Sequence, residues 1–315
     1  MKKISVVIAC CNEEDNIGPL VHRVTEIMKT QLVKYDYEII CIDNDSSDST
    51  QEKIRVLCAE NKKIKAIFNT HNFGSVRSSI FGLLQATGDM VVKMCADFQD
   101  PPELLVDFVR EYESGHRIVL AIKSDAEENK LMYNLRELYY KMIAKITDIH
   151  HIENFEGYGL YDSGFIEILR SLNDPTPYFR GIVAELGFKY QPVYYHKPAR
   201  KSGRSKYNLY RLYDYAMNGI TSYSKVPLRI AAFGGAFVAF VSFVIGLFYL
   251  VMKLMYWNKF SLGVAPVMVG LFFVGAVQLV FLGLIGEYIS AINIRVMKRP
   301  LVTVQEAINM GNDEE

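Results

Sequence analysis

The first 122 residues alternate short apolar runs with longer helix-like segments. The apolar runs are largely β-branched and bounded by polar turns, which predicts buried strands at Ile4 to Cys10, Glu38 to Ile42, Ile64 to Phe68, Met90 to Met94 and Ile118 to Ile122. The segments between them predict helices, several with Asp or Ser near the start, at Asn16 to Val33, Ser49 to Glu60, Ser75 to Ala86 and Pro102 to Ser114. This repetition predicts an α/β fold in which helices cover both faces of a mostly parallel sheet.

Two uncharged apolar runs dominate the other end of the chain, Ile230 to Met252 and Phe260 to Gly286. As helices rising ~1.5 Å per residue they would extend about 34 and about 40 Å, which exceeds the ~30 Å hydrocarbon core of a bilayer. We therefore predict two transmembrane helices rather than buried core helices. The turn between them, Lys253 to Lys259, is short, so the helices form a hairpin and both chain ends lie on one side of the membrane.

Basic residues are distributed unequally around this hairpin. The turn carries only two, whereas five flank the outer ends: Lys225, Arg229, Arg295, Lys298 and Arg299. Because cytoplasmic segments carry the excess of Lys and Arg, we expect the N-terminal head to be cytoplasmic. The formal charge of the whole chain is zero, with 35 basic and 35 acidic residues, which argues against a nucleic-acid-binding protein.

These patterns divide the chain into four regions. The head covers residues 1–206, an interfacial region 207–228, the transmembrane hairpin 229–287 and a cytoplasmic tail 288–315. Tyrosine and aliphatic residues recur at helical spacing from Tyr207 to Tyr223, which predicts an amphipathic helix on the membrane surface. A helix packed on the sheet is the alternative for this segment.

Polar loops follow the first, second and fourth predicted strands. They cover residues 12–14, 43–47 and 97–102, and parallel sheets place their ligand sites at such carboxyl ends. The sequence has no G-x-G-x-x-G or G-K-[ST] loop, which disfavours NAD-binding proteins and P-loop NTPases. Any single carboxylate could instead cap a helix. Asp97 and Asp100 flank Gln99 just before a Pro-Pro helix start, which favours oxygen ligation of Mg²⁺ or Mn²⁺ near a diphosphate.

Several strings of residues stand out in order along the chain: V-V-I-A-C-C-N-E-E-D-N-I, E-I-I-C-I-D-N-D-S-S-D-S-T, N-F-G-S-V-R-S-S-I, A-D-F-Q-D-P-P-E, Y-F-R-G-I-V-A-E-L-G-F and A-R-K-S-G-R-S-K-Y. Together they resemble glycosyltransferase family 2, in its polyprenyl-phosphate branch, nearly from end to end. The resemblance implies a GT-A type, Rossmann-like sheet and transfer of one sugar from a UDP or GDP sugar to a polyprenyl phosphate such as undecaprenyl phosphate. It also implies a multi-pass protein of the bacterial inner membrane, and it leaves a homo-oligomer open.

The same resemblance implies a donor site on the polar loops. Glu13 and Asp43 would hold the base and ribose of the nucleotide sugar, and Asp97 would bind the metal ion at its diphosphate. Three further residues of these loops and of the N-F-G-S string join the expected donor site: Asp45, Arg77 and Gln99.

A cluster of cations just ahead of the membrane is the expected acceptor site. It comprises Arg200, Arg204, Ser205 and Lys206, and Arg136 on a helix predicted over 129–146 could also reach the lipid phosphate. An ordinary basic stripe attracted to anionic lipid head groups is the alternative.

Two departures from the family pattern bear on the mechanism. The usual D-x-D reads Cys95-Ala96-Asp97, so one metal carboxylate is missing, although diphosphate oxygens and water can complete the coordination. G-D-F-R-L reads E-G-Y-G-L, so Gly157 takes the aspartate position, and Glu156 beside it joins Asp97 as a candidate catalytic carboxylate. A phosphate acceptor is already ionised near pH 7 and needs no general base, which favours direct, inverting attack on the anomeric carbon.

Two other functions compete with this interpretation. The chain could extend a lipid-linked saccharide or act as a processive polysaccharide synthase, but such synthases usually carry Q-x-x-R-W and the only Trp here is Trp257, in the membrane turn. It could also be a catalytically silent relative that binds nucleotide or lipid as a membrane scaffold, which the departures at Cys95 and Gly157 would favour.

Overall fold

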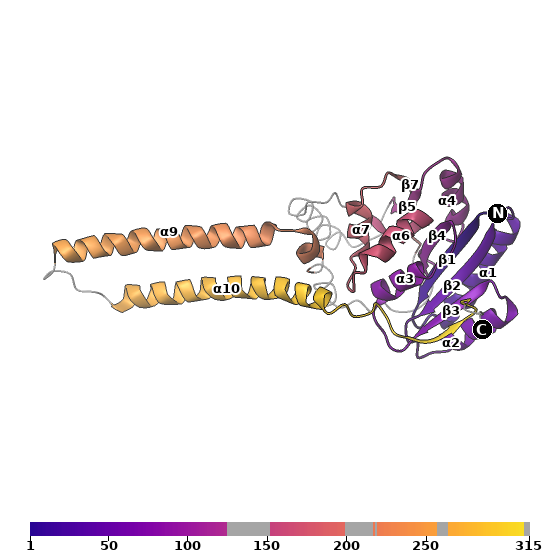
Figure 1. The fold of residues 1–315 in the computed structure, drawn as a ribbon, viewed down its shortest axis with the longest axis horizontal. Helices are drawn as coiled ribbons and strands as arrows, with labels where there is room; N and C mark the ends of the chain where they lie inside the picture. Colours follow the sequence, from indigo (N-terminus) through magenta and orange to yellow (C-terminus); the bar gives the residue numbers. More distant parts are fainter. Residues whose placement is uncertain (125–151, 199–216, 218, 257–263, 312–315) are drawn as a thin grey trace.

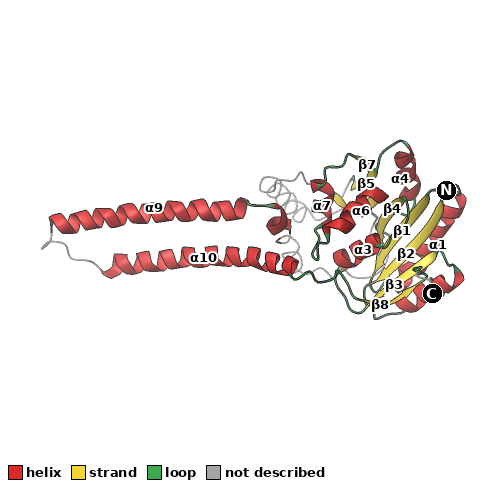
Figure 2. Cartoon of the chain, in the orientation of Figure 1, coloured by secondary structure: helices red, strands yellow, loops and turns green. Residues whose placement is uncertain are grey.

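The computed structural model describes residues 1–124, 152–198, 217, 219–256 and 264–311. An eight-stranded sheet in the order β7-β5-β6-β4-β1-β2-β3-β8 forms the centre of the head, with helices on both faces (Figure 2). The strands are β1 Lys3–Cys10, β2 Asp36–Asp43, β3 Ile64–Asn69, β4 Met90–Cys95, β5 Ile118–Lys123, β6 Phe155–Asp162, β7 Tyr190–Tyr195 and β8 Val304–Ile308. The head helices are α1 Glu14–Thr30, α2 Thr50–Glu60, α3 Ser75–Leu84, α4 Leu104–Glu113, α6 Ser163–Leu172 and α7 Phe179–Glu185.

All five strands predicted from the apolar runs are confirmed, and β1 to β4 pair in parallel as expected. The sheet is nevertheless mixed, because β6 runs antiparallel between β4 and β5, and β8 runs antiparallel along β3. The sequence did not predict β6, β7 or β8. Their sequences F-E-G-Y-G-L-Y-D, Y-Q-P-V-Y-Y and V-Q-E-A-I contain no continuous apolar run, so only tertiary pairing identifies them as strands.

Two apolar layers hold the helices against the sheet. Side chains alternate across a strand, so Ile4, Val6 and Ile8 of β1 face α1, α2 and α4, whereas Val7 faces α3, α6 and α7. All four are completely buried. Burial of the central strands from both sides explains why their sequences are almost continuously apolar.

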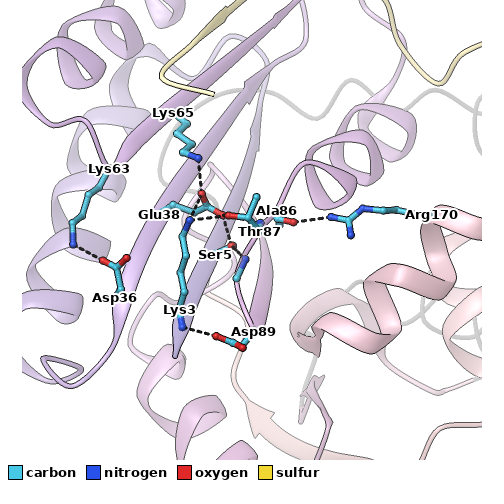
Figure 3. Close-up of polar contacts among 11 residues, drawn as sticks. Lys3, Ser5, Asp36, Glu38, Lys63, Lys65, Ala86, Thr87, Asp89 and Arg170 are labelled. Atoms are coloured by element: carbon cyan, nitrogen blue, oxygen red, sulfur yellow. Dashed lines mark hydrogen bonds and ion pairs between the residues drawn. The ribbon is translucent and has the colours of Figure 1, made fainter. Parts of the chain in front are cut away.

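A buried carboxylate ties the amino ends of the central strands together (Figure 3). Glu38 of β2 pairs with Lys3 at 2.8 Å and with Lys65 of β3 at 2.7 Å. Its other oxygen accepts hydrogen bonds from the hydroxyl of Ser5 and from the backbone N–H of Thr87. Glu38 is almost completely buried, so this network links β1, β2, β3 and the segment before β4 at the edge opposite the acidic loops.

Two long helices extend from one end of the head as a hairpin (Figure 1). They are α9 Val226–Met255 and α10 Val264–Val296, and both are apolar and long enough to cross a membrane. Phe233, Phe240 and Leu279 are among many large apolar side chains that they expose. Water would oppose such exposure strongly, which supports placing the hairpin in lipid.

Polar contacts join the base of α10 to the segment just before α9 and to the head. Tyr288 of α10 donates to the backbone carbonyl of Ser224 at 2.8 Å, and Arg295 donates to the Ser222 hydroxyl at 2.6 Å. Arg295 also approaches Asp174 of the head, with 3.7 Å between Nε and Oδ1. The base of the apolar hairpin and the head are therefore in direct contact.

The segment after α10 returns to the head and completes the sheet. Residues 304–308 form β8 along β3, and Glu306 pairs with Arg55 of α2 at 2.5 Å. Asn309 donates to the backbone carbonyls of Cys58 and Ile64, each at 2.9 Å. The sequence-based division treats 288–315 as a separate tail, whereas part of this region is an edge strand of the head.

Candidate functional site

The loops after β1 and β2 are joined by hydrogen bonds from short polar side chains. The backbone N–H of Asn12 donates to Ser46 Oγ at 2.8 Å, and that of Ser47 donates to Asn12 Oδ1 at 2.7 Å. The backbone N–H of Glu13 donates to Thr50 Oγ1 at 2.9 Å. The register of β1 with β4 places Ala9 beside Cys95, so the third acidic loop starts at the same edge. The three loops therefore meet at the carboxyl edge of the sheet.

Asp43, an expected nucleotide ligand, shapes its own loop. It ends β2 and is completely buried. One carboxylate oxygen accepts from the backbone N–H of Ser46 at 3.0 Å and from Gln51 Nε2 at 2.9 Å. Asp45 is exposed and adopts a left-handed backbone with φ of +59°. In this geometry Asp43 fixes the loop and Asp45 is its solvent-facing carboxylate.

Glu13 lies at the start of α1 and is also buried. Its carboxylate accepts a hydrogen bond from Asn16 Nδ2 at 2.6 Å, one turn into the helix. Glu13 thus connects the first acidic loop to the helix that follows, on the edge where the donor nucleotide is expected.

Asparagines that the sequence analysis did not single out connect the loops after β2 and β3. Asn44 accepts from Asn69 Nδ2 at 3.2 Å and from the backbone N–H of Phe73 at 3.0 Å, and it donates to Asn72 Oδ1 at 2.9 Å. Asn44 and Asn69 are buried. The string N-F-G after the third predicted strand is visible in the sequence, but only the fold shows that Asn72 and Phe73 contact Asn44.

Arg77 does not point freely toward the acidic loops. It lies in the first turn of α3, its guanidinium is 5.3 Å from the ring centroid of Phe73, and it donates to the backbone carbonyl of Pro300 at 2.8 Å. Burial lowers the pKa of this guanidinium. Its Nε is buried and has no hydrogen-bond partner in the described structure. Arg77 therefore links the start of α3 to the segment that follows α10.

The loop after β4 carries the expected metal ligand. Asp97 is partly exposed, and its Oδ1 accepts from the backbone N–H of Gln99, itself partly exposed, at 3.2 Å. Asp100 is buried and accepts from the backbone N–H of Cys95 at 2.8 Å. Burial raises the pKa of Asp100 to about 6, although the nearby charge of Lys93 and the Cys95 hydrogen bond oppose this. Asp100 closes the loop, which leaves Asp97 as its accessible carboxylate.

The protein's own contribution to a metal site is small. Among the described residues, no group of three or more His, Cys, Asp or Glu side chains could hold a metal ion. Cys95 stands where a second hard oxygen ligand is expected, and thiol sulfur is a poor ligand for Mg²⁺. These residues fit a divalent cation only if the donor's diphosphate supplies most of the ligands and Asp97 supplies one.

Glu156, the other candidate catalytic carboxylate, lies between two ammonium groups. In β6 it pairs with Lys123 at the end of β5 and with Lys197 after β7, the latter at 2.7 Å. Burial raises the pKa of Glu156, but the charges of these lysines outweigh it and bring the pKa down to about 2. A carboxylate with so low a pKa is a weak base near neutral pH, so this geometry does not support proton abstraction by Glu156. Neither lysine belongs to a sequence motif that pointed to the site.

The expected acceptor residues lie outside the described part of the chain. They are Arg136, Arg200, Arg204, Ser205 and Lys206, and most of the interfacial segment from Tyr207 to Tyr223 lies there too.

Comparison with known proteins gives two separate matches along this chain. Residues 5–183 match the sequence profile described as Glycosyl transferase family 2. Residues 226–292 match the profile described as the GtrB C-terminal hairpin. The first match covers more than half of the chain, and the second corresponds to α9 and most of α10.

Relatives of similar length carry related names. A bactoprenol glucosyl transferase derived from the SfII prophage of Shigella flexneri is 32% identical over 311 residues, covering 98% of this chain and 99% of its own. An uncharacterized glycosyltransferase of Synechocystis is 31% identical over 305 residues, covering 96% and 95%. Among solved structures, glucosyl-3-phosphoglycerate synthase of Mycobacterium tuberculosis in complex with Mn²⁺ and UDP is 16% identical, and the match covers 70% of this chain and 78% of that structure. Its TM-score of 0.43 is too low to support an argument.

Proposed function

Because the chain belongs to glycosyl transferase family 2 and is a glycosyltransferase with a GT-A type sheet, we propose that it transfers one sugar from a nucleotide sugar to a polyprenyl phosphate. The expected acceptor is undecaprenyl phosphate, in keeping with the name of the Shigella relative. The expected location is the cytoplasmic face of a bacterial inner membrane, since the basic residues Lys225, Arg229 and Arg295 flank the outer ends of the hairpin.

The observation that carries this proposal is that no side chain at positions 156 and 157 can act as a general base. Gly157 has no side chain to accept a proton, and the carboxylate of Glu156 is paired with Lys123 and Lys197. A sugar hydroxyl acceptor would need a base here, whereas a phosphate monoester is already an anion near pH 7. The described site thus suits a phosphate acceptor better than a saccharide hydroxyl.

In the proposed reaction, a lipid-phosphate oxygen attacks the anomeric carbon while the nucleoside diphosphate leaves from the opposite side. The bond to the departing oxygen breaks as the new bond forms, so a single displacement inverts the configuration at that carbon. The fixed loops around Asn12, Asp43 and Asn44 would orient the nucleotide, and Glu13, Asp45 and Gln99 lie on the same edge. Asp97 would hold one divalent cation, Mg²⁺ or Mn²⁺, whose charge would stabilise the departing diphosphate.

The hairpin supports the acceptor side of this proposal. The contact of Arg295 with Asp174 keeps the base of α10 against the head, so a membrane-embedded acceptor would lie within reach of the head. The basic segment with Arg200, Arg204, Ser205 and Lys206, aided by Arg136, would then receive its phosphate. Proximity of this kind lowers the entropic cost of bringing a lipid and a soluble donor together.

The test is transfer of radiolabel from a panel of UDP and GDP sugars to undecaprenyl phosphate by the full chain in detergent, with Mg²⁺ or Mn²⁺. We expect labelled lipid from one donor. The label should be lost in Asp97→Asn and retained in Asp36→Asn. Asp36 is a suitable control because it is a similar exposed carboxylate, paired with Lys63 at the opposite edge of the sheet. Label found only in a lipid-linked saccharide, or nucleotide binding with no transfer, would contradict the proposal.

A further inference from the structure

A lysine lies in the interior of the head on the strand that leads into the expected metal loop. Lys93 is the fourth residue of β4, in the otherwise apolar sequence M-V-V-K-M-C, and it is only 8% exposed. Alternation along the strand puts it on the same face as Cys95, the face covered by α3, α6 and α7.

The ammonium of Lys93 has no direct partner of opposite charge. Within the described part of the chain, neither a hydrogen bond nor an ion pair reaches its Nζ, which lies 5.9 Å from the ring centroid of Phe179. Asp100 is close enough for the charge of Lys93 to lower its pKa, but the hydrogen bond that Asp100 accepts comes from Cys95. An ammonium on a mostly buried residue that makes no direct ion pair favours binding of an anion that reaches it.

The Lys93 side chain occupies space next to Gly157. A Cβ atom placed on Gly157 would lie 3.3 Å from Lys93 Nζ and 3.3 Å from Phe179 Cδ1. In the antiparallel register Lys93 is opposite Gly159, so its side chain runs up the strand toward the level of Cys95 and Gly157. Positive charge is therefore present between the two positions where the family pattern expects carboxylates, Cys95 and Gly157.

The two lysines near Lys93 already have an acidic partner. Lys123 and Lys197 share the carboxylate of Glu156 and are thereby neutralised in part. Lys93 is four residues before Asp97, on the strand whose carboxyl end carries the expected diphosphate loop. Its position and its unpaired charge suit an anionic oxygen arriving from that edge of the sheet.

We infer that Lys93 is a phosphate-binding residue of the active site, whose ammonium receives an anionic oxygen from a substrate of the transfer reaction. The inference rests on the proposed function, since a glycosyl transfer of this kind brings two phosphate groups to the site. The donor's diphosphate and the acceptor's phosphate monoester share the chemistry that Lys93 would recognise. With either source, Lys93 supplies positive charge next to the phosphate. A site with carboxylates at positions 95 and 157 would instead obtain that positive charge from a metal ion.

The experiment measures binding to the full chain in detergent by calorimetry, with UDP, GDP and farnesyl phosphate as probes and farnesol as an uncharged control. Lys93→Met should weaken binding of at least one phosphate probe by 10-fold or more, while Lys93→Arg, which keeps the charge, retains much of it. Lys63→Met, which removes an exposed lysine at the opposite edge, should bind all probes as the unmodified protein does. Loss of nucleotide binding assigns Lys93 to the donor, and loss of farnesyl phosphate binding assigns it to the acceptor.

Thermal unfolding separates a binding role from a structural one. Because Lys93→Met removes a charge that makes no direct ion pair on a mostly buried residue, its unfolding temperature should equal or exceed that of the unmodified protein. A Lys93→Met protein that binds UDP, GDP and farnesyl phosphate normally, or that weakens binding only because it unfolds at lower temperature, would overturn the inference. If binding depends on Lys93 but no sugar reaches undecaprenyl phosphate, the transfer proposal fails and Lys93 keeps its role. If Lys93→Met transfers sugar and binds the probes normally, the transfer proposal stands and the inference about Lys93 fails.

Discussion

Replacing Glu38 with glutamine tests whether the buried network at the amino ends of the strands stabilises the head. The substitution keeps the shape and hydrogen-bonding oxygen of the side chain but removes its charge. Lys3 and Lys65 would then lose their shared partner, while the Ser5 hydroxyl and the Thr87 N–H could still donate to the amide oxygen. The expected loss therefore comes mainly from the two ion pairs.

The size of the loss follows from the pKa of Glu38. Burial raises this pKa, but the hydrogen bonds from Lys3, Lys65 and Ser5 more than offset it and lower the pKa from 4.5 to about 2. At about 1.36 kcal/mol for each pH unit, the difference of 4.5 − 2 corresponds to roughly 3.4 kcal/mol of stability. The side chains of Lys3 and Lys65 remain 27% and 16% exposed. Screening by solvent at the lysines reduces the expected loss to about 2–3 kcal/mol.

The pH dependence has a definite sign. Glu38 has a lower pKa in the folded protein than in the unfolded chain, so its contribution is fully present above about pH 5 and disappears as the pH falls toward 2. The stability difference between the unmodified protein and Glu38→Gln should therefore be constant near neutral pH and should close between pH 5 and pH 2.

Hydrogen exchange followed by mass spectrometry measures this stability locally in the full chain. Amides of β1 and β2 should exchange roughly 30- to 150-fold faster in Glu38→Gln at pH 7, which is 2–3 kcal/mol expressed as a ratio. Asp36→Asn is the matched control, since Asp36 is on the same strand and pairs with Lys63, but both side chains are about half exposed (Figure 3). Its effect should stay below about 1 kcal/mol. Equal exchange in the two variants at pH 7 would refute the reasoning.

Further predictions concern the site and the edge strand. Glu156→Gln should lower the unfolding temperature by several degrees, because the buried ammonium of Lys123 loses its partner. A variant as stable as the unmodified protein would contradict a stabilising role of this ion pair. Gly157→Ala should cost about 1–3 kcal/mol in urea unfolding, since φ is +98° and Lys93 and Phe179 are close, and Gly74→Ala, with φ of +88° but open space, should cost less. Removing residues 300–315 should expose the edge of β3 and cause concentration-dependent association, measured by light scattering. A truncated protein that stays monodisperse would argue against a protective role of β8.

The candidate site was predictable where chemistry follows directly from a strand end. Asp43 and Asp97 terminate or follow apolar strands, and parallel strands bring such ends to one edge, so sequence alone placed them together. Glu156 was different, because its neighbours Lys123 and Lys197 are far from it in sequence. Their pairing, which makes Glu156 a weak base, depends on β5, β6 and β7 being adjacent.

Lys93 illustrates a signal that was present but incomplete. A charged residue within an apolar strand is visible in M-V-V-K-M-C, yet the sequence cannot say whether such a lysine is paired or which residues its ammonium lies beside. That answer required the register of β4 with β6, which puts Lys93 opposite Gly159 and within reach of Gly157.

The sequence by itself determined the elements whose apolar pattern is strong and local. These are the strands β1 to β5, the helices between them and the two long apolar helices α9 and α10, because burial on both faces or in lipid requires long apolar runs whatever the rest of the chain does. Only the tertiary structure decided the mixed character of the sheet, the return of residues 304–308 to β3 and the partners of Arg77, Lys93 and Glu156. Such features depend on contacts between distant segments, and local sequence patterns do not encode the register or the charge pairing that those contacts create.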